Sequence, residues 1–233
     1  MNSSFVLSLL LTVFVTLVAA SARSKGSPSP TYTSSIPLSP SSNAFTRGQV
    51  GSSVTVDLWI DLACSDCMND WPMLTEVWES YGDKVQFNYR VFPLPYHQFA
   101  FLLAKSCQVV NNHGSDGDVF NFIDFSFIPS NQGMIYNSVT SGLSYDDILT
   151  SVVSGWVSNS TSIGSDDYLR YMSTDYQNEP MADYNAEMDA RYAFKNAAAN
   201  GVIGTPTVWV NGVEVDGLDS IEQWDLALAE VLN

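Results

Sequence analysis

Two cysteines separated by two residues, Cys64 and Cys67, constrain this 233-residue chain more than any other feature. They lie in the stretch DLWIDLACSDCMNDWPML, directly after an apolar run and directly before a segment with helical spacing. Such a pair can ligate a metal, form a structural disulfide or exchange disulfides with other thiols. The surrounding sequence has to distinguish these three uses.

The segments around the pair predict alternating strands and helices. Residues 53–62 are rich in β-branched and aromatic side chains and predict a buried strand. Residues 65–82 show helical spacing and end at a glycine. Residues 84–94 alternate as a second strand, and residues 97–112 predict a second helix. This order predicts a parallel pair of strands joined by a right-handed crossover, and hence an α/β fold.

The rest of the chain is predicted to be mainly helical until a final hairpin. Residues 114–180 read as short helices separated by Gly, Ser and Asn, and we interpret them as a helical insertion. A long helix is expected over residues 181–201, and a terminal helix over residues 219–233. Between these helices, two β runs flank Asn211 and Gly212, a residue pair typical of a hairpin turn.

The N-terminal segments are expected to lie outside the folded domain. Residues 1–22 carry an apolar run followed by small residues, which predicts a secretory signal peptide, with an uncleaved membrane anchor as the alternative. Residues 23–48 form a Ser/Pro-rich linker that is expected to be extended or disordered. Residues 49–233 then form a single domain that is not expected to contact a membrane once the signal is removed.

Charge and cysteine content exclude several classes of protein. A net charge of −16 repels phosphate backbones, so nucleic acid is not an expected partner. Three cysteines are too few for a disulfide-stapled scaffold. The third, Cys107, lies in an apolar helical pattern and is predicted to be a buried, inert thiol, with a resolving or intermolecular cysteine as the alternative.

The three uses of the cysteine pair are not equally well supported. A zinc site needs four ligands, and only Cys107, His97 and His113 could complete one. A structural disulfide across two residues closes a very small loop and removes little unfolded-state entropy. A redox pair uses the same spacing well, because the second thiol can resolve a mixed disulfide formed by the first. At a helix N-terminus, unpaired amides also favour the thiolate of Cys64.

Motifs beyond the pair resemble the thioredoxin superfamily, and within it the DsbA-like branch. Pro72 follows Cys67 with four residues between them, the C-x4-P spacing of thioredoxin active-site helices. Residues 201–212 (GVIGTPTVWVNG) are similar to the cis-proline loop, with Pro206 as the cis residue. A helical insertion and the phrase FPLPYH at residues 92–97 are also DsbA-like. The resemblance implies a central mixed sheet flanked by helices and a disulfide oxidoreductase activity without a metal or organic cofactor.

The resemblance assigns roles to individual residues. Cys64 is expected to be the nucleophile and Cys67 the resolving cysteine, while Thr205 and Pro206 bind an extended substrate peptide. Asp66, between the cysteines, should disfavour a second negative charge and make the protein a milder oxidant than DsbA.

Four further residues are candidates for tuning or modification. Asp57 shares a strand face with Asp61, and both are candidates for a buried proton-relay acid, with Asp57 the one proposed. His97 follows the second strand and could contact substrate or shift the charge on the nucleophile, although a local hydrogen bond at the helix start is the simpler interpretation. Asn159 begins a glycosylation sequon.

The sequence therefore predicts a secretory-pathway thiol–disulfide oxidoreductase. The alternative is a secreted thioredoxin-fold module that binds peptides or acts as a chaperone with little redox turnover. Expected partners are protein or peptide thiols and disulfides, together with a redox partner protein or glutathione. The chain ends in AEVLN without a KDEL-type signal, which favours secretion or a secretory-pathway lumen.

Overall fold

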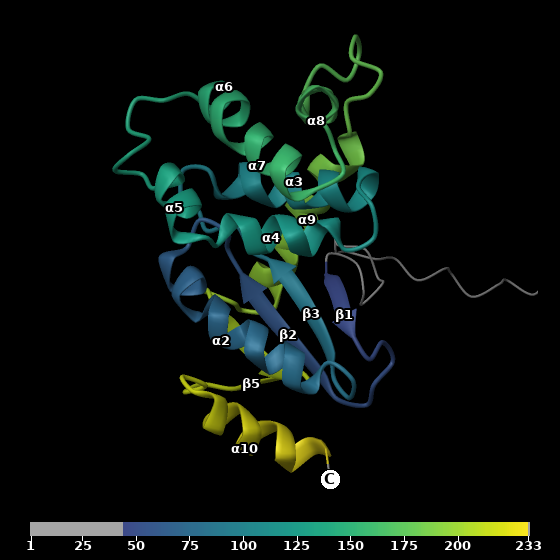
Figure 1. Cartoon of the computed structure of the whole chain (residues 1–233), viewed down its shortest axis with the longest axis vertical. Coiled ribbons are helices and arrows are strands. Elements are labelled where there is room, and N and C mark those ends of the chain that lie inside the picture. Colours follow the sequence, from purple (N-terminus) through teal and green to yellow (C-terminus); the bar gives the residue numbers. More distant parts are fainter. Residues whose placement is uncertain (1–43, 233) are drawn as a thin grey trace, which may run out of the picture. The chain divides into compact units, whose positions relative to one another are not determined.

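A computed structural model of the chain describes residues 44–232 (Figure 1). The chain divides into two units, Met1–Ser35 and Ile36–Asn233. The first unit, including the predicted signal peptide, and the greater part of the predicted linker lie outside the described residues. Within the described part, no helix has the length and apolar character needed to cross a bilayer.

The core of the fold is a mixed five-stranded sheet in the order β1-β3-β2-β4-β5. Strands β2 (Thr55–Ile60) and β3 (Gln86–Val91) are parallel, and Thr55 pairs with Gln86. The helix α2 (Ser65–Tyr81) connects them, so the predicted strand–helix–strand unit is confirmed. The remaining strand pairs are antiparallel.

The predicted hairpin closes one edge of the sheet. Strands β4 (Thr207–Val210) and β5 (Val213–Glu214) pair antiparallel across a two-residue turn. Both turn residues have positive φ, 49° at Asn211 and 80° at Gly212. This conformation is the one that an Asn-Gly pair adopts at low cost, so the hairpin prediction is confirmed.

The opposite edge of the sheet corrects the predicted linker boundary. Residues Phe45–Gly48 form β1, which pairs antiparallel with β3, and Phe45 is buried. Gly48 ends the strand with a φ of 90°, and a Cβ there would clash with the Val85 carbonyl oxygen. The ordered domain therefore begins before residue 49, because one buried aromatic and a pairing edge outweigh the Ser/Pro-rich composition of the preceding residues.

Helices surround the sheet and form the predicted insertion. Helix α3 (Ala100–His113) is buried along nine consecutive residues, Leu102–Val110, and packs against α4, α8 and α9. Figure 1 shows the insertion helices gathered toward one end of the sheet, with α10 near the other. Between Gly114 and Pro180 the elements are α4 (Asp118–Ser126), α5 (Pro129–Gln132), η1 (Gly133–Ile135), α6 (Tyr145–Ile148), the π-helical η2 (Leu149–Val153), α7 (Ser154–Ser160) and α8 (Ser165–Met172). Two longer helices follow, α9 (Tyr184–Ala199) and α10 (Ile221–Leu232).

Candidate active site

The cysteine pair lies where β2 leads into α2. Cys64 is the N-cap residue of α2, and its carbonyl oxygen accepts the first helical hydrogen bond from the Met68 amide at 3.2 Å. Cys67 lies in the first turn of the helix and is fully buried, whereas Cys64 retains 5% of its exposure. Both are free thiols in this structure. Cys64 thus keeps a slight exposure to solvent, and Cys67 has none.

The surroundings of Cys64 favour its thiolate. A hydrogen bond from the Cys67 thiol has the largest effect and lowers the pKa of Cys64, while burial acts in the opposite direction. The Thr205 side chain and the backbone amides of Cys67 and Asp66 lower it further, to a pKa of about 6. These amides belong to the first turn of α2, so the predicted effect of the helix N-terminus is present.

The surroundings of Cys67 favour its thiol. Burial raises the pKa of Cys67 well above its ordinary value, and the hydrogen bond with Cys64 and the charge on Cys64 raise it further. The two pKa values therefore shift in opposite directions, which is the division of labour that thiol–disulfide exchange requires.

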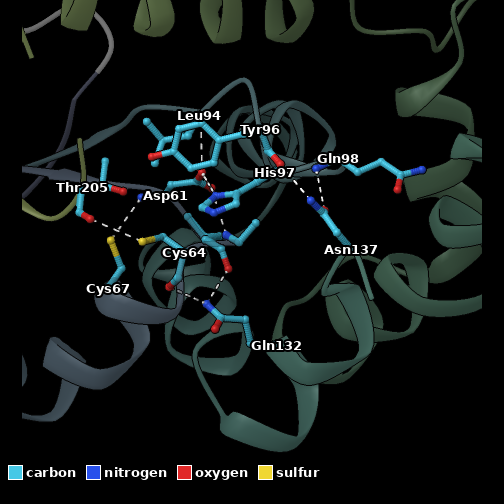
Figure 2. Close-up of polar contacts among 12 residues, drawn as sticks. Asp61, Cys64, Cys67, Leu94, Tyr96, His97, Gln98, Gln132, Asn137 and Thr205 are labelled. Atoms are coloured by element: carbon cyan, nitrogen blue, oxygen red, sulfur yellow. Dashed lines mark hydrogen bonds and ion pairs between the residues drawn. The ribbon is translucent and has the colours of Figure 1, made fainter. Parts of the chain in front are cut away.

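The loop before β4 reaches the nucleophile. The Thr205–Pro206 peptide bond is cis. The Cys64 thiol donates to the Thr205 carbonyl oxygen at 3.3 Å, a contact visible in Figure 2. Because β4 pairs antiparallel with β2, the start of β4 lies beside the end of β2 from which the cysteines project. The sheet itself thus brings Thr205 to Cys64.

A buried carboxylate lies beneath the cysteine pair. Asp61 is fully buried, and its Oδ1 accepts a hydrogen bond from the Ala63 amide at 2.9 Å. Its Oδ2 accepts from the Leu94 amide at 3.0 Å and lies 2.7 Å from His97 Nδ1 (Figure 2). The Asp61 backbone amide lies 3.5 Å from the sulfur of Cys67. This carboxylate ties the turn that carries Cys64 to the loop that follows β3.

The structure gives Asp57 a different environment from the one predicted. Its Oδ1 lies 2.6 Å from Arg90 Nε and accepts a hydrogen bond from Asn88 Nδ2 at 3.2 Å. All of these residues lie in the interior of the paired strands β2 and β3. Asp57 therefore serves an ion pair across the sheet, and Asp61 is the aspartate whose backbone amide contacts the sulfur of Cys67. Alternation along the strand made the two look equivalent, but β2 ends at Ile60, so the alternation does not extend to Asp61.

The other predicted site residues occupy separate places. Asp66 is exposed in the first turn of α2, next to the pair. Cys107 is fully buried in α3, where burial raises the pKa of its thiol, so the prediction of a buried thiol is confirmed. Asn159 is exposed near the end of α7.

Sequence analysis did not identify the contribution of the insertion to the site. Gln132, the last residue of α5, is fully buried. Its Nε2 donates to the carbonyl oxygens of Leu62 at 2.9 Å and Cys64 at 3.0 Å, and its Oε1 accepts from the Tyr136 hydroxyl at 3.0 Å. No local pattern marks this glutamine, because its partners on the turn lie 68 and 70 positions earlier in the chain.

A cavity lies beside the cysteine turn, between it and residues 135–138 of the insertion. Its volume is about 320 Å³. Its walls include residues on both sides of Cys64 in the chain, as well as His97. The lining residues are Ala63, Ser65, His97, Ile135, Tyr136, Asn137 and Ser138. Asn137 Nδ2 also donates to the Tyr96 carbonyl oxygen at 2.8 Å, which fixes the loop that carries His97.

Comparison with known proteins places this site in a recognised family. The family model Thioredoxin_4, described as "Thioredoxin", matches residues 41–230. The comparison with curated proteins gives no match.

Solved structures share the fold at low sequence identity. BdbD from Bacillus subtilis is 13% identical with a TM-score of 0.62, and the match covers 84% of this chain and 96% of that one. MdbA, a thiol-disulfide oxidoreductase from Actinomyces oris, is 15% identical with a TM-score of 0.58, over 82% and 85% of the two chains. A periplasmic thioredoxin-like protein from Salmonella enterica serovar Typhimurium is 17% identical with a TM-score of 0.57, over 84% and 93%. The predicted resemblance to DsbA-like proteins is thus confirmed for the fold.

Proposed function

Because this chain belongs to the thioredoxin family, we propose that it is a protein thiol–disulfide oxidoreductase that works through Cys64 and Cys67. The observation that carries the proposal is the opposite shift of the two thiol pKa values at one strand–helix junction. At neutral pH a reduced Cys64 is mainly a thiolate and can attack, whereas Cys67 keeps its proton until Cys64 is consumed.

The oxidising direction runs through one mixed disulfide. A substrate thiolate attacks the Cys64 sulfur of the Cys64–Cys67 disulfide, and the sulfur of Cys67 leaves as a thiolate that takes up a proton. A second substrate thiolate then attacks the substrate sulfur of the mixed disulfide, and Cys64 leaves as a thiolate. Two electrons pass from two substrate thiols to the enzyme, and the substrate keeps the new disulfide. In the reducing direction, Cys64 attacks a substrate disulfide and Cys67 resolves the intermediate.

The Thr205–Pro206 segment is proposed to hold the substrate chain. Proline offers no amide hydrogen, and Thr205 is adjacent to the nucleophile, so an extended peptide can pair with the Thr205 backbone beside Cys64. Such pairing depends on backbone atoms and accepts many substrate sequences. Protein and peptide thiols are therefore the proposed substrates, with a redox protein or glutathione restoring the enzyme and no further cofactor.

We place this activity in the secretory pathway or outside the cell. The apolar N-terminus supports this location, and one protein of similar fold is described as periplasmic. The exposed position of Asn159 on α7 supports its proposed glycosylation. Expression in a eukaryotic secretory host, followed by glycosidase treatment of wild type and Asn159→Gln, tests both points. A mobility shift in the wild type alone supports them, and retention of the unmodified protein in the cytosol contradicts them.

An insulin-reduction assay tests the proposed activity. Wild type and Cys107→Ala should catalyse reduction, because Cys107 is buried away from solvent. Cys64→Ser should be inactive, and Cys67→Ala should accumulate mixed disulfides with substrate. Equal activity of wild type and Cys64→Ser would remove the redox proposal and leave the peptide-binding alternative.

A further inference from the structure

His97, which follows β3 and contacts the buried Asp61 carboxylate, has a specific use at the cysteine pair. We propose that Asp61 and His97 form a positioned charge pair whose imidazolium stabilises the Cys64 thiolate and makes the enzyme's reduction potential sensitive to pH. This inference rests on the proposed function, because a stabilised thiolate matters only if Cys64 exchanges disulfides.

The first step is the position of His97. The same cavity is lined by His97 and by the two chain neighbours of Cys64, Ala63 and Ser65. The imidazole side chain is 22% exposed, so it can exchange protons with solvent through this opening. Figure 2 shows the ring beside the turn that carries Cys64, whose sulfur is directed toward Thr205. His97 is therefore a titratable base beside the turn that carries the nucleophilic cysteine, Cys64.

The second step is the role of Asp61 in fixing the ring. The carboxylate is fully buried and is held by the amides of Ala63 and Leu94, so it cannot turn away from His97 Nδ1 at 2.7 Å. A buried carboxylate favours a cation next to it, and this hydrogen bond is the main reason that the pKa of His97 is raised. Asp61 is thus a positioning residue that acts through His97.

The third step concerns every charged or titratable group that faces the imidazole. Asp61 lies beneath it, and the charges of Cys64 and Asp66 also raise its pKa, whereas burial lowers it. The Tyr96 ring lies 4.8 Å away at an edge-to-face angle, and Tyr136 lines the shared cavity. No Lys or Arg lines this cavity, so among the described residues that form it His97 supplies the cation.

The consequence is a proton coupled to the electron transfer. Reduction of the disulfide takes two electrons from a pair of substrate thiols and one proton, which remains on Cys67. The charge of the Cys64 thiolate that forms draws a further fraction of a proton onto His97. Thiolate and imidazolium coexist above the Cys64 pKa of about 6 and below the raised pKa of His97. Above that window the imidazole is neutral, and the uncompensated Asp61 carboxylate disfavours the thiolate.

The chain offers a matched control for the test. It has two histidines, and His113 likewise lies 2.8 Å from a carboxylate, that of Asp183, at the end of α3. In the reduced protein, His97→Gln should raise the pKa of Cys64 by about one unit, which is the lower end of the effect that a nearby opposite charge has on a pKa. The control variant His113→Gln should leave the pKa of Cys64 unchanged. The readout is thiolate ultraviolet absorbance against pH, with Cys64→Ser subtracted. The reduction potential of His97→Gln should also be more negative near neutral pH, and the additional pH dependence in the range where His97 titrates should be lost.

A second measurement stands even if His97→Gln fails to fold. Coupling between two sites is reciprocal, so Cys64→Ser should lower the pKa of His97 in an NMR titration, with the signals of His113 as the internal control. Equal Cys64 pKa values in the two histidine variants, or a His97 titration unaffected by Cys64→Ser, would overturn the inference. An intact His97–Cys64 coupling in a protein that fails to reduce insulin would support the charge pair and overturn the proposed function instead.

Discussion

The Cys64 thiol donates to the carbonyl oxygen of Thr205 at 3.3 Å, although 141 positions separate the two residues in the chain. The contact follows from sheet topology, because β4 runs antiparallel to β2 and begins beside the point where β2 ends. A substrate sulfur that reaches Cys64 therefore also meets the backbone of Thr205. The side chain of the same residue is among the groups that lower the pKa of Cys64, so Thr205 contributes both to the proposed substrate contact and to activation of the thiol.

The pH dependence of alkylation should reveal the activated thiol. Iodoacetamide reacts with the thiolate, so the rate at Cys64 should rise with pH through about 6 and then level off. Cys67 and Cys107 should stay unmodified in the folded protein over this range, because burial raises the pKa of both thiols. Intact mass against time, with Cys64→Ser as the control, measures this. A midpoint near the ordinary thiol pKa of about 8.5 would contradict it.

Replacing Asp66 should make the protein a stronger oxidant. The carboxylate lies between the two cysteines in the chain and is exposed, so in Asp66→Ala the pKa of Cys64 should fall by up to about one unit, with the effect reduced by salt. The glutathione redox equilibrium should shift toward the reduced enzyme. Asp83→Ala, an exposed carboxylate after the other end of α2, serves as the control. An unchanged Cys64 pKa in Asp66→Ala would show that solvent screens this charge fully.

The two strand aspartates should give different phenotypes. Asp57→Asn weakens a partly buried ion pair with Arg90, so stability should fall by about 1 kcal/mol while the Cys64 pKa and the exchange rate stay the same. Asp61→Asn replaces one of the two oxygens that serve two amides and His97 by an NH2 donor and removes the negative charge, so stability should fall by about 2 kcal/mol and the His97 pKa should drop. Denaturant unfolding and NMR titration of both variants distinguish them. A redox change in Asp57→Asn would restore its predicted role as proton relay.

Removing the buried glutamine should weaken the fold from within the insertion. Gln132→Leu leaves the Leu62 carbonyl and the Tyr136 hydroxyl without this partner, and we expect a loss of about 2 kcal/mol. The exposed Gln98→Leu removes a hydrogen bond of 3.4 Å and should change stability by less than about 0.5 kcal/mol. Urea midpoints with an unchanged slope give both values. Equal midpoints would mean that water replaces the glutamine at the turn.

Local signals account for what the sequence could predict. The apolar run before Cys64 and the spacing after it define β2 and α2, and the Asn211–Gly212 pair defines the hairpin, because each signal lies within a few residues of the structure it specifies. The early start of the domain escaped prediction because β1 is short and depends on its pairing with β3.

Long-range contacts account for what it could not predict. The carboxylate of Asp61 is distinguished from that of Asp57 by the loop that folds over it, and Gln132 by carbonyls far earlier in the chain. Nothing in the residues near either position reports these partners. The chemistry of the cysteine pair can therefore be predicted from the sequence, whereas the roles of Asp61 and Gln132 depend on tertiary contacts.

The Gln132 side chain gives the enzyme a mechanical link. The amide group of Gln132, the last residue of α5, donates to two carbonyls of the reactive turn. Because Gln132 is fully buried, neither α5 nor the turn can shift far without breaking a buried hydrogen bond. A displacement of α5 would therefore also strain the backbone of the turn that carries Cys64. The Gln132 amide thus connects the position of the helical insertion directly to the position of the reactive turn.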